Sequence, residues 1–323
     1  MKKYILIFAI SAVFTACEQE EIPVINEPGE TPGVITNQLE MGDDYQTQMF
    51  YDLGTNSVVG QNLKTSWDLG FEASPSGWRV VLNTANGGAV ANTEISDFES
   101  VTSASGWEWK NEVNSGNLDS TAFGDYRETL NVYIVDRGFD VEGNSLGFFK
   151  IVIESVDESN YTIRAANLDG SNEQTLSIPK NDELNFVAYS FELGSVVSVE
   201  PPKDSWDILF SQYTFVFIDP PTAYIVTGAL INRNGVEVAV DYSTPFENID
   251  LEFANSLEYT NNIDVIGYEW KFFDFTAAIY LVDSDINYII KDTEGRIFKL
   301  HFTDFYNQNG EKGAPEFEVQ ELL

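Results

Sequence analysis

The sequence predicts an all-β protein made of two tandem antiparallel β-sandwich or open-barrel domains, and three observations predict it. Short aromatic and β-branched runs alternate apolar with polar residues, and Asn, Asp and Gly turns separate these runs. The same motifs occur twice along the chain, in the same order. Helical periodicity is hard to find anywhere. Together these features are typical of sandwiches and open barrels.

The alternation is clearest in two segments at matching places of the repeat. In residues 298–303, Phe, Leu and Phe alternate with Lys, His and Thr, and residues 149–154 follow a similar pattern. A period of two is typical of half-buried strands. Between residues 161–165 and 175–178 lies Asp169-Gly170, which predicts a hairpin.

The repeat consists of motif pairs that keep their order in both halves of the chain. The pairs are Tyr51-Asp52-Leu53-Gly54 with Phe191-Glu192-Leu193-Gly194, Ser66-Trp67-Asp68 with Ser205-Trp206-Asp207, Leu82-Asn83 with Ile231-Asn232, Gly106–Lys110 with Gly267–Lys271, and residues 148–151 with 297–300. A tandem duplication explains the whole set. It predicts one β domain over residues 45–183 and a second over residues 184–323, joined near Pro179–Leu184.

The first 16 residues have the organisation of a secretory signal peptide. Two lysines precede an apolar run, and small residues then lead to Cys17, the only cysteine of the chain. The apolar run is about half of the roughly 20 residues that a membrane-spanning helix needs. The order Phe14-Thr15-Ala16-Cys17 resembles a bacterial lipobox, which implies that Cys17 is acylated after cleavage. An ordinary signal peptide with a cysteine near its cleavage site is the alternative.

Residues 17–44 predict an extended tether between this anchor and the folded part. The segment is rich in Pro and acidic residues, and it is too polar to pack. The acidic residues that follow Cys17 resemble export signals of lipoproteins that reach the outer face of the outer membrane. We therefore expect a lipid-anchored protein of the outer membrane, exposed at the cell surface.

The charge of the chain excludes some partners. It has 52 acidic residues against 17 Lys and Arg, a formal net charge of −35. Nucleic-acid binding needs a basic surface, so neither DNA nor RNA is expected as a partner. The 43% hydrophobic and 14% aromatic content is far too high for a disordered acidic tail. The sequence predicts well-packed β domains.

Several of these motifs resemble the HmuY family. They are the Ser-Trp-Asp segments at 66–71 and 205–210, Gly-Tyr-Glu-Trp-Lys at 267–271, and residues 299–302 with 309–313. That family consists of all-β, surface-exposed lipoproteins, some of which capture haem for an outer-membrane receptor. The resemblance implies HmuY-like domains and a binding protein rather than an enzyme. It also implies haem or a related porphyrin as ligand class and a receptor as partner.

The chain has few side chains that could bind the iron of haem, and this limits the inference of haem binding from the resemblance. Haem binders of the family hold iron between two axial side chains, commonly His and in some members Met. This chain has one histidine, His301, and after processing its methionines are Met41 and Met49. Two-histidine ligation within one molecule is excluded, which leaves His301 as the single candidate cofactor ligand. Strand parity also allows His301 to be a half-exposed sheet residue without a ligand, and we expect weak or absent haem binding.

Other chemistry is not indicated. One cysteine and one histidine cannot form a structural zinc site. Two acidic loops, at residues 136–144 and 283–287, lack the spacing of an EF-hand and are interpreted as solvated turns. No nucleophile motif or phosphate-binding loop occurs, so we expect neither an enzyme nor a metal site. A glycan- or protein-binding surface lipoprotein, or an accessory structural one, remains an alternative to haem capture.

The tryptophans of the repeated motifs are interpreted mainly as core residues, because an indole at a strand position is first a large packing group. These are Trp67, Trp109, Trp206 and Trp270. The alternative is that one or two of them line a ligand cleft.

Overall fold

The computed structural model describes residues 33–323, so the predicted signal peptide (1–16), Cys17 and most of the predicted tether (17–44) lie outside the described residues. The strands of the earlier part are β1 (Ile35–Gln38), β2 (Thr47–Asp52), β3 (Ser57–Leu63), β4 (Leu69–Glu72), β5 (Val80–Leu82), β6 (Ala89–Asn92), β7 (Tyr133–Asp136), β8 (Phe148–Val156), β9 (Asn160–Asn167), β10 (Gln174–Pro179), β11 (Phe186–Ser190) and β12 (Ser195–Val197). The later strands are β13 (Ile208–Ile218), β14 (Pro221–Ile231), β15 (Glu237–Asp241), β16 (Lys271–Asp274), β17 (Ile279–Val282), β18 (Asn287–Lys291), β19 (Ile297–Tyr306) and β20 (Lys312–Glu321).

Helices are few and short in residues 33–323. They are α1 (Leu251–Asn255) and the 3₁₀ turns η1 (Lys64–Ser66), η2 (Thr84–Asn86), η3 (Leu118–Ser120), η4 (Lys203–Ser205) and η5 (Phe246–Asn248). The all-β prediction is therefore confirmed. Within residues 33–323, no helix combines the length and apolar character that a membrane span requires.

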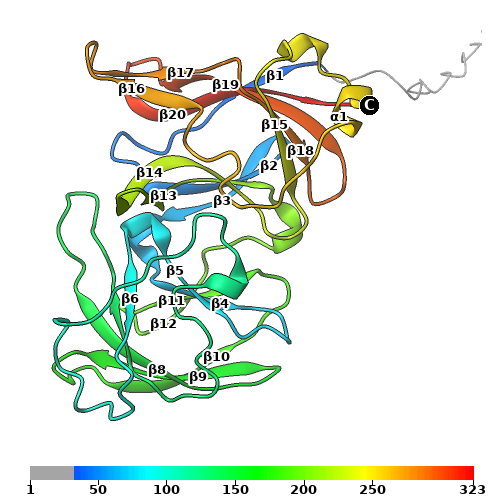
Figure 1. The fold of residues 1–323 in the computed structure, drawn as a ribbon. Coiled ribbons are helices and arrows are strands. Elements are labelled where there is room, and N and C mark those ends of the chain that lie inside the picture. Colours follow the sequence, from blue (N-terminus) through cyan, green and yellow to red (C-terminus); the bar gives the residue numbers. More distant parts are fainter. Residues whose placement is uncertain (1–32) are drawn as a thin grey trace, which may run out of the picture. The chain divides into compact units, whose positions relative to one another are not determined.

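The strands form two sandwiches, which appear in Figure 1 as four sheets one below another. In the first sandwich, the sheet β12-β11-β4-β5 packs on the sheet β10-β9-β8-β7-β6. In the second, the sheet β14-β13-β2-β3 packs on the sheet β1-β20-β19-β18-β15. A separate hairpin, β16–β17, forms a two-stranded sheet of its own.

The alternating segments lie where the sequence predicts. Phe298, Leu300 and Phe302 on β19 are at most 4% exposed and belong to the second core. Ile151 and Ile153 on β8 are buried in the first core. The predicted hairpin is β9–β10, whose strands are antiparallel. The period of two in the sequence thus gives the inward face of each strand.

The order of the strands makes the first sandwich an insertion into the second. The chain starts in the second sandwich with β1–β3, builds the whole first sandwich with β4–β12, and returns to finish the second. It passes between them at residues 64–68 and 198–207. The buried residues of the first core come from 69–191, and those of the second from 39–53 and 208–319. The sheets thus combine strands from both sides of the predicted boundary at residue 183, because β11 pairs with β4 and β2 pairs with β13.

The repeated Ser-Trp-Asp motifs occupy the two crossings and make matching hydrogen bonds. Asn83 Nδ2 donates to the carbonyl oxygens of Lys64 and Trp67. Asn232 Nδ2 donates in the same way to Lys203 and Trp206. Both asparagines are buried, at 3% and 0% exposure. A buried amide that closes a turn in this way is strongly held, since removing it leaves backbone acceptors without partners.

The aspartates of the motifs anchor the neighbouring strand ends. Asp68 accepts from the backbone N–H of Phe191 at 2.7 Å and pairs with Arg137 at 2.7 Å. Asp207 accepts from Leu53 N at 2.8 Å and from Thr293 N at 3.0 Å. Among the described residues no cation pairs with Asp207, and burial raises its pKa to about 6. The two crossings share a backbone arrangement but differ in charge.

A further match lies in the outer sheets. Lys150 Nζ on β8 donates to the carbonyl oxygens of Phe98 and Val101. Lys299 Nζ on β19 donates to those of Phe246 and Ile249, at the place that the sequence repeat pairs with Lys150. A duplicated unit would produce such pairs of contacts. The duplication itself stays a prediction.

The separation of the cores predicts which fragment folds alone. Residues 64–200 contain every strand and core residue of the first sandwich, so this fragment should unfold in one cooperative urea transition, measured by circular dichroism. Residues 184–323 would carry β11 without its partner β4, and β13 without β2. We expect that fragment to be aggregated or much less stable. A 184–323 fragment that unfolds as cooperatively as 64–200 would contradict this expectation.

Candidate ligand-binding surface

His301, the single candidate iron ligand from the sequence, lies on β19 with both ring nitrogens in contact with other groups. Nδ1 is 3.0 Å from the carbonyl oxygen of Ser284, and Nε2 is 3.0 Å from a carboxylate oxygen of Glu318. The ring stacks on Phe246 with centroids 4.1 Å apart, and the side chain is 13% exposed. Iron could bind His301 only after one of these contacts is broken. Its role as a ligand stays a prediction.

The methionines offer no alternative axial pair. Met41 is 1% exposed and Met49 is 8% exposed, and both pack in the second core. Within residues 33–323, no three or more His, Cys, Asp or Glu side chains converge as a metal site would require. The residues present therefore do not fit a haem iron held by two histidines, or by a histidine and a methionine, in one molecule.

The acidic loop at 136–144 closes on itself. Asp140 accepts from the backbone N–H of Asn144 at 2.7 Å and from its side-chain amide at 3.0 Å. These bonds hold the pKa of Asp140 below its usual range, with the Asn144 side chain the largest cause. Asp side chains commonly accept hydrogen bonds from the backbone of their own turn, so these bonds stabilise the loop.

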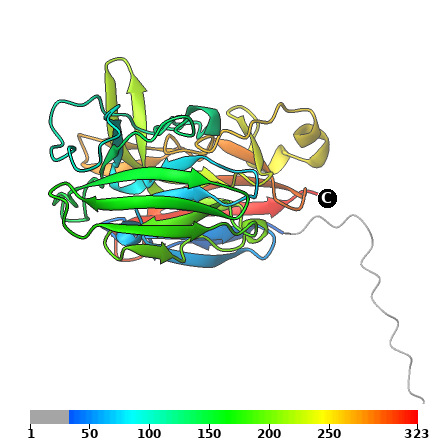
Figure 2. The ribbon, with the colours of Figure 1, turned by 90° about the horizontal axis from the view of Figure 1, so that it is seen from below.

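The hairpin β13–β14 extends beyond the sheet to which it belongs. Its strands pair along their full length, from Ile208 with Ile231 to Ile218 with Pro221. The neighbouring strand β2 pairs with β13 only at residues 208–210. Beyond residue 210, none of the described strands pairs with the edge of β13 that is opposite β14, and the tip of the hairpin projects from the sheets in Figure 2.

Large apolar side chains are exposed near this tip. Phe217 is 39% exposed, Tyr224 is 63% exposed and Ile218 is 91% exposed. Phe215, which is partly buried, connects them to the body of the protein. Its ring centroid lies 5.0 Å from that of Phe217 and 5.2 Å from that of Tyr268.

The hairpin β16–β17 carries a second set of exposed aromatic rings. Phe272 is 55% exposed, Phe273 is 38% exposed and Phe275, in the turn, is 89% exposed. Phe273 contacts both Phe275 and Tyr280, each with ring centroids 5.2 Å apart. Tyr280 in turn packs on the core. The exposed rings are thus supported by a continuous chain of aromatic contacts.

The two hairpins are joined at their bases. Gly267 forms a backbone bridge with Ala229 on β14. Lys271 Nζ donates to the carbonyl oxygen of Thr227 on β14, and burial lowers the pKa of Lys271 to about 7.

The hairpins also approach each other through two tyrosines. The pKa of Tyr280 on β17 is raised by burial and, among smaller causes, by the nearby phenol of Tyr224 on β14. Tyr224 and Tyr280 thus lie near each other, and exposed apolar side chains occur on both hairpins. We call these side chains the aromatic hairpin surface and define it as Phe217, Ile218, Tyr224, Phe273 and Phe275.

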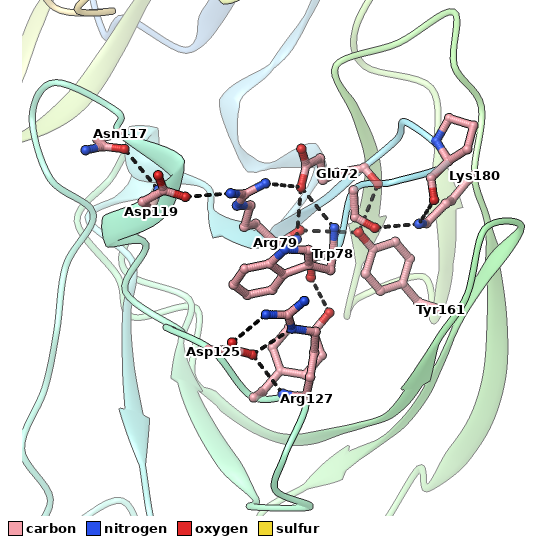
Figure 3. Close-up of polar contacts among 12 residues, drawn as sticks. Glu72, Trp78, Arg79, Asn117, Asp119, Asp125, Arg127, Tyr161 and Lys180 are labelled. Atoms are coloured by element: carbon pink, nitrogen blue, oxygen red, sulfur yellow. Dashed lines mark hydrogen bonds and ion pairs between the residues drawn. The ribbon is translucent and has the colours of Figure 1, made fainter.

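Two other surface features are internally satisfied. Figure 3 shows a cluster around Trp78 in the first sandwich, where Arg127 lies over the indole ring at 3.8 Å and pairs with Asp125 at 2.6 Å. In the same cluster Arg79 pairs with Asp119 at 2.5 Å. These charges neutralise one another, so the cluster stabilises its own loops.

The other feature is a polar groove of about 720 Å³ beside the β11–β12 turn. Arg137 in this groove pairs with Asp68 at 2.7 Å and with Glu192 at 3.3 Å. Phe149 and Phe191 stack there with centroids 4.5 Å apart. No His or Met side chain lines the groove. Its charged and aromatic groups already have partners.

The tryptophans divide between the two interpretations from sequence. Trp270 is 1% exposed and Trp206 is 6% exposed, as expected of core residues. Trp67 and Trp109 are half-buried. Trp67 and Trp206 both line a cavity between the sandwiches. Whether either of them contacts a ligand stays a prediction.

Comparison with known proteins identifies the family. The family model for the HmuY protein matches residues 44–319. The chain belongs to the HmuY family. No curated protein sequence matches it.

Solved structures that resemble the chain have low sequence identity. They include apo PinO from Porphyromonas gingivitis, with 11% identity over 91% of this chain and 99% of that chain, at a TM-score of 0.34. They also include the apo HmuY analog (TFO) of Tannerella forsythia, with 10% identity over 91% of this chain and 100% of that chain, at a TM-score of 0.27. Because these TM-scores are low, the family assignment rests on the match of the HmuY family model to residues 44–319.

Sequence reasoning did not find the aromatic hairpin surface. The available signal was Phe272-Phe273-Asp274-Phe275, which puts aromatic residues on both faces of a short strand and into the turn that follows. In a half-buried strand, apolar side chains are expected only on the face that is turned toward the core. Consecutive aromatic residues that run into a turn therefore indicate exposure.

His301→Ala tests whether the histidine is a ligand or a strand residue. We expect unchanged porphyrin binding, because the ring is already held by Ser284, Glu318 and Phe246. The free energy of unfolding should fall by about 1 kcal/mol through loss of the hydrogen bonds to Ser284 and Glu318 and of the stacked contact with Phe246. The measurements are a Soret titration and urea unfolding. A folded variant that no longer shifts the Soret band would establish His301 as the ligand.

Proposed function

We propose that this HmuY-family protein is a lipid-anchored surface protein that captures a planar ligand of the porphyrin class on its aromatic hairpin surface. The observation that carries the proposal is the gathering of exposed aromatic side chains on two adjoining hairpins, where Tyr224 and Phe275 are 63% and 89% exposed. Soluble proteins rarely leave such apolar groups together on a surface without a partner. The family membership supports a haem-type ligand.

The contacts available on this surface are suited to a flat, apolar ring system. A macrocycle that covers Phe217 and Phe275 buries its own faces and theirs, at about 25 cal/mol per Å² of apolar surface. Aromatic rings add favourable stacked or edge contacts. Because the supporting rings of Phe215 and Phe273 are already packed, little order has to be created on binding.

This mode of capture does not depend on iron. None of the residues that define the aromatic hairpin surface is a histidine, methionine or cysteine. The porphyrin ring, and not the metal, would then supply the binding energy. Haem and metal-free protoporphyrin should bind with similar affinity.

The charge of the protein opposes the acidic groups of a porphyrin. The chain carries a formal charge of −35, and the lysine at the base of the hairpins, Lys271, is buried. The carboxylates of the ligand would have to stay in solvent. Salt screens exposed charges over about 8 Å at physiological ionic strength, so the affinity should rise with added salt.

The anchor and the location belong to the same proposal. Acylation of Cys17 would hold the protein on the outer membrane, and the segment between Cys17 and β1 would let the hairpins reach ligand or receptor. A glycan or a receptor protein could use the same exposed rings, and an accessory structural role would need no ligand. A ligand panel separates these functions.

Titration of the purified protein with haem and with protoporphyrin tests the ligand. Phe217→Ala and Phe275→Ala should each weaken binding of both porphyrins by about tenfold, through loss of an aromatic contact with the ligand. Phe139→Ala is the matched control, because Phe139 is 47% exposed but lies in the first sandwich. Fluorescence quenching and the Soret band measure binding. A low-spin two-histidine spectrum in a monomer, or equal losses in the Phe139 control, would contradict the proposal.

Cys17→Ser tests the anchor. The variant should leave the membrane fraction and appear in the soluble fraction, because a chain without the acylated cysteine lacks the apolar groups that hold it on a bilayer. Fractionation followed by immunoblotting measures this. Retention of the variant in the membrane, with the signal peptide removed, would show that another group anchors the protein.

A further inference from the structure

A partly open cavity lies between the two sandwiches. Its volume is about 150 Å³. One wall is the sheet with β4, β5 and β11, and the other is the sheet with β2, β13 and β14, each turned with its outer face toward the other. The apolar lining includes Phe50, Val81, Phe186 and Leu209. An apolar cavity of this size holds a molecule about as large as benzene.

Two carboxylates line this cavity. Glu112 accepts from the backbone N–H groups of Leu82 at 3.0 Å and Ala122 at 3.2 Å. Glu200 accepts from the backbone N–H groups of Asn185 and Phe186, each at 3.1 Å. Both therefore cap strand ends at the cavity wall. In residues 33–323 neither forms an ion pair with Lys, Arg or His.

One cation lines the cavity with them. Arg233 Nη1 donates to the carbonyl oxygen of Gly116, and its guanidinium lies 5.5 Å from the ring centroid of Phe186. No carboxylate in the described part of the chain lies within ion-pair distance of Arg233. With both glutamates ionised, the three groups carry two negative charges and one positive charge. The cavity thus has a formal charge of −1.

Burial makes both carboxyl groups harder to ionise. Burial raises the pKa of Glu112 to about 7, against which two backbone N–H groups and, more weakly, Arg233 act. Burial likewise raises the pKa of Glu200 to about 7, against which the groups of Asn185 and Phe186 act. Arg233 also faces Glu72, whose carboxylate pairs with Arg79. The existing cation is thus not enough to keep both glutamates fully ionised at neutral pH.

We propose that this cavity binds a small organic cation, namely a primary amine attached to one aromatic ring or a short alkyl chain. The ammonium group brings the formal charge of the cavity to zero and donates to Glu112 and Glu200. The apolar part fills the benzene-sized space, which Trp67 and Trp206 also line. The charge of −35 on the whole chain attracts such cations from solution.

The site should be sensitive to pH, with a defined sign. Below pH 7 the glutamates take up protons, and a neutral carboxyl attracts an ammonium group only weakly. Above pH 7 both are ionised. The affinity for an amine should therefore rise from pH 6 to pH 8, and binding near pH 7 should release protons. This inference is independent of the porphyrin proposal, because the two sites share none of their defining residues.

Isothermal titration of the whole protein with benzylamine tests the proposal, with benzyl alcohol and benzoate as neutral and anionic analogues. Benzylamine should bind more tightly than both, and more tightly at pH 8 than at pH 6. Glu112→Gln and Glu200→Gln should each weaken benzylamine about tenfold, since a charged hydrogen bond becomes a neutral one. Glu142→Gln, in an exposed loop, is the matched control and should bind as the parent does.

A second variant shows where the amine binds. Ala188 lines the cavity and is 7% exposed, so Ala188→Leu should fill the space and abolish binding of benzylamine while the circular dichroism spectrum stays unchanged. Equal affinity for benzylamine and benzyl alcohol would overturn the charge requirement. Unchanged binding by Ala188→Leu, or no binding of benzylamine at pH 8 by the parent, would overturn the site.

Discussion

The double crossing of the chain between the sandwiches is the constraint on which the rest of the structure depends. At each crossing a Trp-Asp pair leaves one sheet and enters the other, and a buried asparagine, Asn83 or Asn232, closes the turn. The aspartates then fix the ends of β11 and β2. If these turns opened, the two sheets that face each other would lose their spacing. The tryptophans of the same motifs line the space between them, so the crossing also determines the shape of the cavity.

Much of the fold could be predicted because it follows local rules. The alternation in residues 298–303 gave the inward face of β19, and Asp169-Gly170 gave the β9–β10 hairpin. The repeat placed matching residues such as Lys150 and Lys299 in matching contacts. The pairing of β11 with β4 could not be predicted from the repeat. A repeat predicts the order of the strands along the chain, but it does not say whether a strand pairs with one from its own copy or from the other copy.

The candidate sites were harder to predict, since they depend on contacts between distant segments. Counting residues was enough to exclude two-histidine ligation, and strand parity placed His301 on the face away from the core. The cavity, in contrast, joins Glu112, Glu200 and Arg233 from three loops that lie far apart in the sequence. In a chain with 52 acidic residues, no spacing distinguishes two buried glutamates from the rest. Only the three-dimensional structure shows which carboxylates are buried.

One strand reaches both proposed sites. Near its start, β13 contributes Leu209 and Ser211 to the cavity wall, and near its end it carries Phe217 at the exposed hairpin. A ligand that shifts or stiffens this strand at one site changes the free energy of the other. Thermodynamic linkage makes such an effect reciprocal, so each ligand would alter the affinity of the other by the same factor. If an amine in the cavity stiffened β13, it would change the affinity of the exposed hairpins for a porphyrin.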